Sequence, residues 1–255
     1  MTGTGGADPG PVAIVTGASS GLGRATAVRL ARDGLRVALL ARDAGVLSEL
    51  ERSIEESGGS ALSRPVDLAD ASAAQAAVDH VISVWGRADA LINAAATDVP
   101  GPVEETTVSD WDRVLDVNLR APFLLSKAVF AHMRRVGGGT IVNVSSVAGL
   151  RGWANAAAYC SSKFALTGFT QALAAEGKPH GIRACVLYPG AMATSWGAWD
   201  AEERRAADGA QAQQPDVDAL PADQIAELIA WIIAAPKGLV LDQVTVTPLN
   251  EKGWP

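Results

Sequence analysis

The segment VAIVTGASSGLGRATAVRLARDG, residues 12–34, decides the fold of this chain. Residues 12–16 form a short apolar run rich in β-branched side chains, which predicts a buried strand, and residues 22–33 have the apolar spacing of a helix. Between them, glycines let the backbone turn tightly, and the following helix presents unpaired N–H groups and a positive dipole end. This turn predicts a site for the pyrophosphate of a dinucleotide, although an ordinary strand-to-helix turn has the same composition.

The alternation of strand and helix continues along the whole chain. Further strands are expected at residues 36–41, 61–66, 88–93, 140–146, 182–189 and 242–248, and further helices at 43–57, 70–85, 109–135, 155–176 and 223–235. Strands that alternate with helices form βαβ units. We therefore expect an α/β protein with a doubly wound parallel sheet, the Rossmann fold, of about seven strands.

No linker or internal repeat divides the chain, so residues 11–255 are expected to form a single Rossmann-type domain. Residues 1–10 are glycine-rich and lack the basic and apolar parts of a signal peptide, which predicts a flexible N-terminal leader. Residues 190–221 are rich in Ala, Gln, Asp and Pro. A long irregular insertion of this kind predicts a substrate lid, a binding loop or a disordered segment.

Composition limits the partners. The 255 residues are 48% hydrophobic and carry a formal net charge of −7, which argues against nucleic acid or an anionic membrane surface and favours a small-molecule substrate. The two cysteines, Cys160 and Cys185, show no metal-type spacing, so neither a metal site nor a disulfide framework is expected. Free thiols point to the cytoplasm.

Tyr159 and Lys163 lie four residues apart in a segment expected to be helical, so their side chains share a face. A lysine cation beside a tyrosine hydroxyl favours the phenolate and lowers the pKa of the phenol, which makes it a usable acid. The alternative is an exposed pair on a helix surface, since this spacing also arises by chance.

Several motifs in order along the chain resemble the short-chain dehydrogenase/reductase family over residues 11–248. The turn at 16–23 matches T-G-x-x-x-G-x-G, and the spacing from Ser146 to Tyr159, 159 − 146 = 13, is the family value. Lys163 follows, and Asn118 matches the helix asparagine of the family. The remaining matches are residues 93–96, NAAA, in place of N-N-A-G, and the Pro189-Gly190 turn followed by Thr194.

The resemblance implies an NAD(P)-dependent enzyme that transfers a hydride between nicotinamide and a ketone or secondary alcohol. Tyr159 would be the proton donor, Ser146 would bond the carbonyl oxygen, and Lys163 would tune the phenol and hold the nicotinamide ribose. Asn118 would anchor a water linked to Lys163. Alternatively, Ser145 or Ser146 merely ends a strand, and Asn118 is a buried amide bonded to backbone.

The preference for NAD or NADP is expected to depend on the residues at the end of the second strand. Ala41 stands where NAD-preferring relatives have an acid, and Arg42 follows, so NADP is preferred and NAD is the less favoured cofactor. Ser20 lacks the second positive charge that many NADP-using relatives have, and Arg42 could instead lie in solvent at the start of the next helix. The expected cofactor-binding residues are Gly17, Ser19, Ser20, Gly21, Leu22, Gly23, Arg42, Asp67, Leu68, Asn93, Ala94, Ala95, Tyr159, Lys163, Pro189, Gly190 and Thr194.

Two interpretations are possible for Asp67 and for the NAAA segment, residues 93–96. Asp67 resembles the family residue that contacts the adenine amino group, but it could instead cap the next helix, for which Asp70 is better placed. Ala94 and Ala96 replace an Asn and a Gly of the family motif, so either this turn is altered or the backbone angles that only glycine adopts are not needed there.

Substrate contacts are expected from Trp153, Met192, Trp196 and Trp199, which suggests a ketone with an apolar or aromatic body. The tryptophans could equally pack the lid against its own helix. The chain ends in VTVTPLNEKGWP, and similar ends in the family pack across subunits, which implies a homo-oligomer, a tetramer or a dimer.

Three other functions compete with an NADP-dependent reductase. One is a non-catalytic dinucleotide-binding protein that senses NADPH or acts as a scaffold, whose catalytic residues would be incomplete. Another is an NAD-dependent dehydrogenase of hydroxy acids or alcohols. The third is a related epimerase or dehydratase, but those proteins are usually longer and have a distinct substrate domain.

Overall fold

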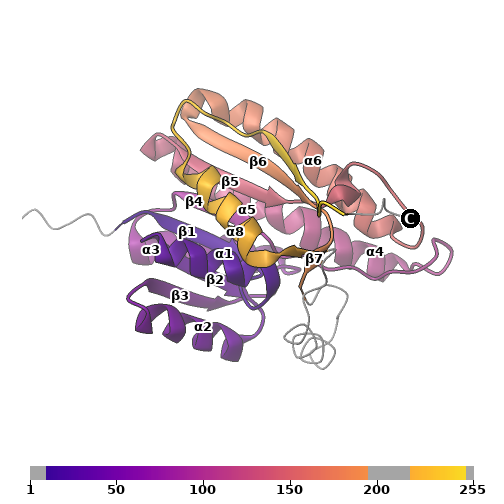
Figure 1. The fold of residues 1–255 in the computed structure, drawn as a ribbon, viewed down its shortest axis with the longest axis horizontal. Helices are drawn as coiled ribbons and strands as arrows, with labels where there is room; N and C mark the ends of the chain where they lie inside the picture. Colours follow the sequence, from indigo (N-terminus) through magenta and orange to yellow (C-terminus); the bar gives the residue numbers. More distant parts are fainter. Residues whose placement is uncertain (1–9, 195–218, 251–255) are drawn as a thin grey trace, which may run out of the picture.

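A parallel sheet of seven strands runs through the centre of the protein in the order β3-β2-β1-β4-β5-β6-β9 (Figure 1). The computed structural model describes residues 10–194 and 219–250. Every neighbouring pair of strands is parallel, which confirms the predicted doubly wound α/β sheet. The strands are β1 (Val12–Thr16), β2 (Arg36–Ala41), β3 (Ser60–Pro65), β4 (Ala90–Asn93), β5 (Gly139–Val144), β6 (Ile182–Pro189) and β9 (Gln243–Val246).

Helices cover both faces of this sheet. They are α1 (Gly21–Arg32), α2 (Ala44–Glu56), α3 (Ala71–Trp85), α4 (Val108–Leu115), α5 (Ala121–Val136), α6 (Ala157–Gly177) and α8 (Ala222–Ala234). Successive strand residues point to opposite faces. In β1, Ala13 and Val15 pack with α1, α2 and α8, whereas Val12 and Ile14 pack with α3, α5 and α6. All of β1 is buried, as expected for a strand covered on both sides.

Strand order places a crevice beside β1. The chain builds β2 and β3 on one side of β1, then crosses to the other side for β4, β5 and β6. The loops that leave β1 and β4 therefore diverge at the carboxyl edge of the sheet, which is where ligands bind in open α/β sheets.

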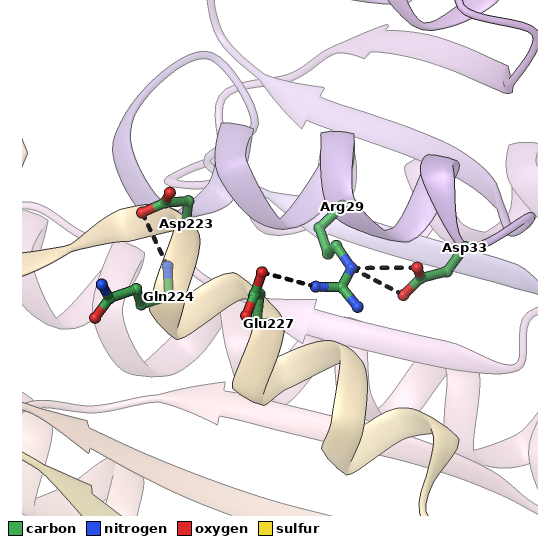
Figure 2. A network of polar contacts seen from close by, with 5 residues as sticks. All are labelled: Arg29, Asp33, Asp223, Gln224 and Glu227. Carbon is green, nitrogen blue, oxygen red and sulfur yellow. Dashed lines mark hydrogen bonds and ion pairs between the residues drawn. The ribbon is translucent and has the colours of Figure 1, made fainter.

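Helix α8 returns the chain to the sheet beside α1. Figure 2 shows Arg29 of α1 bridging Asp33 on its own helix and Glu227 on α8, at 3.1 and 3.2 Å. Glu227 is largely exposed, so this ion pair adds at most about 1 kcal/mol. Burial of Ile225 and Ile229 against the α1 side of the core holds α8 in place.

The helix predicted over 109–135 is interrupted. Helix α4 ends at Leu115, a π-helical turn spans Asp116–Arg120, and α5 continues to Val136. Apolar spacing does not report a π turn, because the turn adds only one residue to a helix that otherwise keeps its pattern. Elsewhere the predicted elements are present with small shifts at their ends, and β5 stops at Val144 instead of reaching residue 146.

Most of the predicted lid, residues 195–218, lies outside the described residues, as do 1–9 of the leader and 251–255 of the tail. The two ends of the lid segment meet in a small parallel pair, β7 (Met192–Ala193) and β8 (Leu220–Pro221). This pairing brings Met192 beside Leu220 at the carboxyl edge of the main sheet.

Candidate active site

A cavity of about 590 Å³ opens at the carboxyl ends of the central strands. Its walls come from the turn after β1 and from the segments that follow β2, β3, β4, β5 and β6, together with α4, the π turn and α6. The lining includes all of the expected cofactor-binding residues except Asn93. It also includes Ser146, Trp153 and Met192, so separate parts of the chain that sequence motifs singled out meet around one space.

The glycine turn leaves no room for side chains. Gly17 has φ of +69°, and a Cβ on Gly23 would lie 2.2 Å from the carbonyl oxygen of Gly17. Ser20 is the N-cap of α1, yet its side chain makes no capping hydrogen bond. The first-turn N–H groups of α1 therefore face the cavity without a side-chain cap, which fits the phosphate-binding role of such turns.

The loop after β4 is held against the glycine turn by a side chain. Thr16 Oγ1 accepts hydrogen bonds from the backbone N–H groups of Ala94 and Ala95, both at 3.0 Å. Among the described residues, Asn155 is the one non-glycine residue with positive φ, so Ala96 does not need the angles of a glycine. Replacement of the family glycine by Ala96 thus leaves ordinary backbone geometry at this position.

Asn93 differs from its expected position. Its side chain is buried, and Nδ2 donates to Asn143 Oδ1 at 2.7 Å inside the sheet instead of lining the cavity. The Asn93 side chain thus links β4 to β5, and a direct contact between it and a cofactor stays a prediction.

Asn118 sits in the π turn and is fully buried. Its Oδ1 accepts from Thr97 N and its Nδ2 donates to Thr97 O, both at 2.8 Å, and Nδ2 also donates to Ser162 Oγ at 3.1 Å. The side chain thus links the loop after β4 to α6 through hydrogen bonds. The amide bonds to backbone, as one of the sequence interpretations held, and π turns of this kind are frequent at functional sites.

Tyr159 and Lys163 lie one turn apart near the start of α6. Both are buried, with 8% and 2% of their surface exposed, so the interpretation as an exposed helix pair is wrong. Lys163 Nζ donates to the carbonyl oxygen of Val144 at 2.9 Å and lies 5.6 Å from the centre of the Tyr159 ring. The lysine therefore joins α6 to the end of β5.

The pKa shifts of Tyr159 and Lys163 differ from those that their spacing alone predicts. Burial raises the pKa of Tyr159 well above its ordinary value, while hydrogen bonding with Ser146 lowers it in part and the charge of Asp98 raises it further. Burial also lowers the pKa of Lys163 to about 7, and Asp98 opposes that shift. In the protein alone the Tyr159 pKa is therefore shifted upward, opposite to the expected direction, because desolvation is the largest influence on the phenol.

Ser146 lies two residues after the end of β5 and caps a short 3-10 turn, Val147–Gly149. Its Oγ accepts from Ala148 N at 3.1 Å and interacts with the Tyr159 hydroxyl across the cavity. The hydroxyl of Ser145 is bonded elsewhere, with Oγ donating to Lys163 O at 3.2 Å. Of the two serines, Ser146 is therefore the one whose hydroxyl hydrogen-bonds with Tyr159.

The far end of the cavity carries Arg42, Asp67 and Leu68, with Ser20 nearby. Asp67 Oδ1 accepts from Ala69 N at 3.0 Å, whereas Asp70 caps α3 through Ser72 N at 2.9 Å, so Asp67 is not the cap of that helix. Asp67 lines the cavity instead, and its contact with the adenine stays a prediction.

At the other end, Trp153 and Met192 line the cavity, and Trp153 packs against the small buried cluster that includes Tyr159. Trp196 and Trp199 lie outside the described residues. Two charged residues of the cavity were not predicted, Asp98 and Arg113. Asp98 follows the NAAA motif by two residues, and an acid so close to a motif at the end of a strand was a signal that could have marked it.

The described ranges, 10–194 and 219–250, contain no group of three His, Cys, Asp or Glu side chains that could hold a metal ion. Within the same ranges, no helix has the length and apolar character needed to cross a membrane.

Comparison with known proteins agrees with the motifs. A family model described as short chain dehydrogenase matches residues 11–205. The chain is 39% identical over 193 residues to D-threitol dehydrogenase of Mycolicibacterium smegmatis, covering 75% of this chain and 74% of that protein. It is 33% identical over 248 residues to levodione reductase of Leifsonia aquatica, covering 94% and 92%.

Solved structures show the same likeness. A metagenomic short-chain oxidoreductase, solved in complex with NADP, superposes with a TM-score of 0.80 at 33% identity and covers 93% of this chain and 97% of its own. A crystal structure of levodione reductase superposes with a TM-score of 0.82 at 29% identity, covering 96% and 98%.

Proposed function

Because this chain belongs to the short-chain dehydrogenase/reductase family, and is thereby an oxidoreductase, we propose that it interconverts a ketone and a secondary alcohol with NADP(H). The observation that carries this proposal is the convergence of Ser146, Tyr159 and Lys163 on the cavity that also holds the glycine turn. A non-catalytic binding protein would not need an intact proton donor beside that turn.

Tyr159 is the proposed acid. Burial keeps its hydroxyl protonated near neutral pH, so in the reductive direction it gives its proton to the carbonyl oxygen. Ser146, at the phenol, donates a hydrogen bond to the same oxygen as negative charge develops there. The nicotinamide supplies or accepts the hydride when it is bound.

Lys163 and Asn118 are the proposed supporting residues. Lys163 Nζ lies at the end of β5, within the cavity wall, where it would hold the nicotinamide ribose. Asn118 positions the loop after β4 through both atoms of its amide group. We propose that this positioning, and not proton transfer by the Asn118 side chain, is its main contribution.

The proposed preference for NADP rests on the far end of the cavity. Ala41 has no acidic group to bind a ribose 2′-hydroxyl, and the adjacent Arg42 lines the cavity as a positive charge for a 2′-phosphate. A neighbouring structure at 33% identity was solved with NADP. Arg42→Asp should reverse the preference, measured as the ratio of kcat/KM for NADPH and NADH, and an unchanged ratio would remove this argument.

The test of the enzymatic proposal is a substitution at Tyr159. Tyr159→Phe should lower kcat by about 100- to 10,000-fold, because the proton donor is lost while the ring still fills its place. Cofactor affinity, followed by NADPH fluorescence, should stay within about threefold, since the hydroxyl is not needed for the glycine turn. Retained turnover with ketones would contradict the assignment of Tyr159.

A homo-oligomer is also proposed, in the cytoplasm. Phe123 on α5 is 43% exposed and lines a shallow apolar hollow together with Leu119 and Phe169, and Phe164 on α6 is 47% exposed. Exposed aromatic side chains around a hollow are typical of an interface. Phe123→Glu should lower the mass measured by light scattering, whereas Val136→Glu, exposed at the end of the same helix, should not.

A further inference from the structure

The cavity contains a carboxyl group that the proposed chemistry does not use. Asp98 lies on the loop after β4 and lines the cavity together with Tyr159, Trp153 and Met192. A carboxylate in a cavity whose other side carries Trp153 and Met192 is unexpected for an enzyme that takes only apolar ketones. Such a group is costly to bury unless something bonds to it.

The loop holds Asp98 in a defined place. The preceding residue, Thr97, is fixed at both its N–H and its carbonyl by the buried amide of Asn118, each bond measuring 2.8 Å. The Asp98 carboxylate accepts one bond, from Val99 N at 2.8 Å, which orients its Oδ1. Among the described residues this is the one hydrogen bond that the carboxylate makes, so it retains accepting capacity.

Asp98 lies at the reacting end of the cavity. Its charge raises the pKa values of both Tyr159 and Lys163, an effect that requires proximity to both. Partial burial raises the pKa of Asp98 itself to about 6, so the group is ionised at neutral pH but poorly solvated. A poorly solvated carboxylate gains most from a new hydrogen-bond donor.

We propose that Asp98 selects substrates that carry a second hydroxyl near the reacting carbon, such as vicinal diols and the corresponding hydroxyketones. The second hydroxyl donates to the Asp98 carboxylate, while Tyr159 and Ser146 bond the oxygen that reacts. An alcohol without that hydroxyl leaves the carboxylate partly desolvated with its remaining acceptor positions unfilled, a penalty of the kind that gives strong discrimination. This inference rests on the proposed function.

The pair butane-2,3-diol and butan-2-ol tests the proposal, because the two alcohols differ by one hydroxyl. In each oxidation the carbinol carbon gives a hydride to NADP⁺ and its hydroxyl gives a proton, through Tyr159, to solvent. The wild-type kcat/KM should favour the diol by about tenfold or more. Asp98→Ala should reduce this preference by about 10- to 100-fold, and Asp98→Asn by less, because its amide oxygen still accepts.

Asp112→Ala is the matched control, since Asp112 is an exposed acid on α4 outside the cavity. It should leave the ratio unchanged. Equal wild-type kcat/KM values for the two alcohols, or an equal loss for both in Asp98→Ala, would overturn the proposal. Ligand-observed NMR on the protein with NADP⁺ gives the affinity ratio independently. No turnover of any alcohol would contradict the proposed function, while that affinity ratio would still decide the role of Asp98.

Discussion

Two loops meet at the cavity, one after β1 and one after β4, and they are built in opposite ways. The loop after β1 depends on missing side chains, since a Cβ at Gly23 would strike the backbone of Gly17. The loop after β4 depends on side chains supplied from elsewhere, Thr16 Oγ1 and the Asn118 amide. The loop after β1 has no room for an additional atom, whereas the loop after β4 depends on the polar atoms of these two side chains.

The largest effect is expected at the first loop. In Gly23→Ala the new Cβ would lie 2.2 Å from Gly17 O and 2.5 Å from Gly17 C, so the backbone must move. We expect NADPH affinity to fall by about 100-fold or more and the free energy of unfolding to fall by about 3 kcal/mol. Fluorescence titration and urea denaturation measure the two changes.

Gly45→Ala provides the control, at an early position of α2 where a Cβ would make an ordinary contact at 3.4 Å. It should change neither quantity appreciably, because the site has room. If Gly23→Ala behaved like Gly45→Ala, close packing would not be what shapes the first loop.

The loop after β4 should lose its defined position when Asn118 loses its polar atoms. Asn118→Leu keeps the side chain's size but leaves the N–H and C=O of Thr97 unpaired beside a buried position. We expect a loss of about 2–4 kcal/mol in the free energy of unfolding and a fall in kcat/KM as the loop shifts. Asn118→Asp, whose protonated carboxyl can accept from Thr97 N and donate to Thr97 O, should lose less than Asn118→Leu at low pH, where the buried acid stays neutral. The opposite ranking would contradict the positioning role.

A smaller effect is expected where the two loops touch. Thr16→Val keeps the shape of the side chain but removes the acceptor for the N–H groups of Ala94 and Ala95, at a cost of about 1–3 kcal/mol. Thr16→Ser keeps the hydroxyl and should lose less. Thermal denaturation ranks the two variants, and a Ser variant as unstable as the Val variant would show that the methyl group matters more than the bonds.

The smallest effect concerns Lys163, whose pKa of about 7 lies below its ordinary value of 10.5 because it is buried. Between these values the unfolded chain binds more protons, so this group makes stability rise with pH and is most destabilising below pH 7. Lys163→Met should be inactive. It should also be more stable than the wild type, and this gain in the free energy of unfolding should be about 1–2 kcal/mol larger at about pH 6 than at about pH 8.5. A pH-independent difference in urea midpoints would contradict the burial effect.

Most of the sheet was predictable because buried strands and amphipathic helices leave periodic patterns of apolar residues. The apolar run of β1 is continuous because both of its faces are buried, and the strands were located within a few residues of their bounds. The π turn around Asn118 was not predictable, since it changes the helical register without changing composition. Asp98 was missed because no motif contains it; its importance follows from which side chains surround it.

The glycine turn and the order Ser146, Tyr159, Lys163 were determined by the sequence alone, because steric room and residue spacing are local properties of the chain. The protonation behaviour of Tyr159 and Lys163 was decided by the tertiary structure, which buries both and reverses the shift expected for the phenol. The same holds for Asn118 and Asp98, which act through partners far away in the chain. Desolvation and long-range hydrogen bonds exist only after the chain has folded.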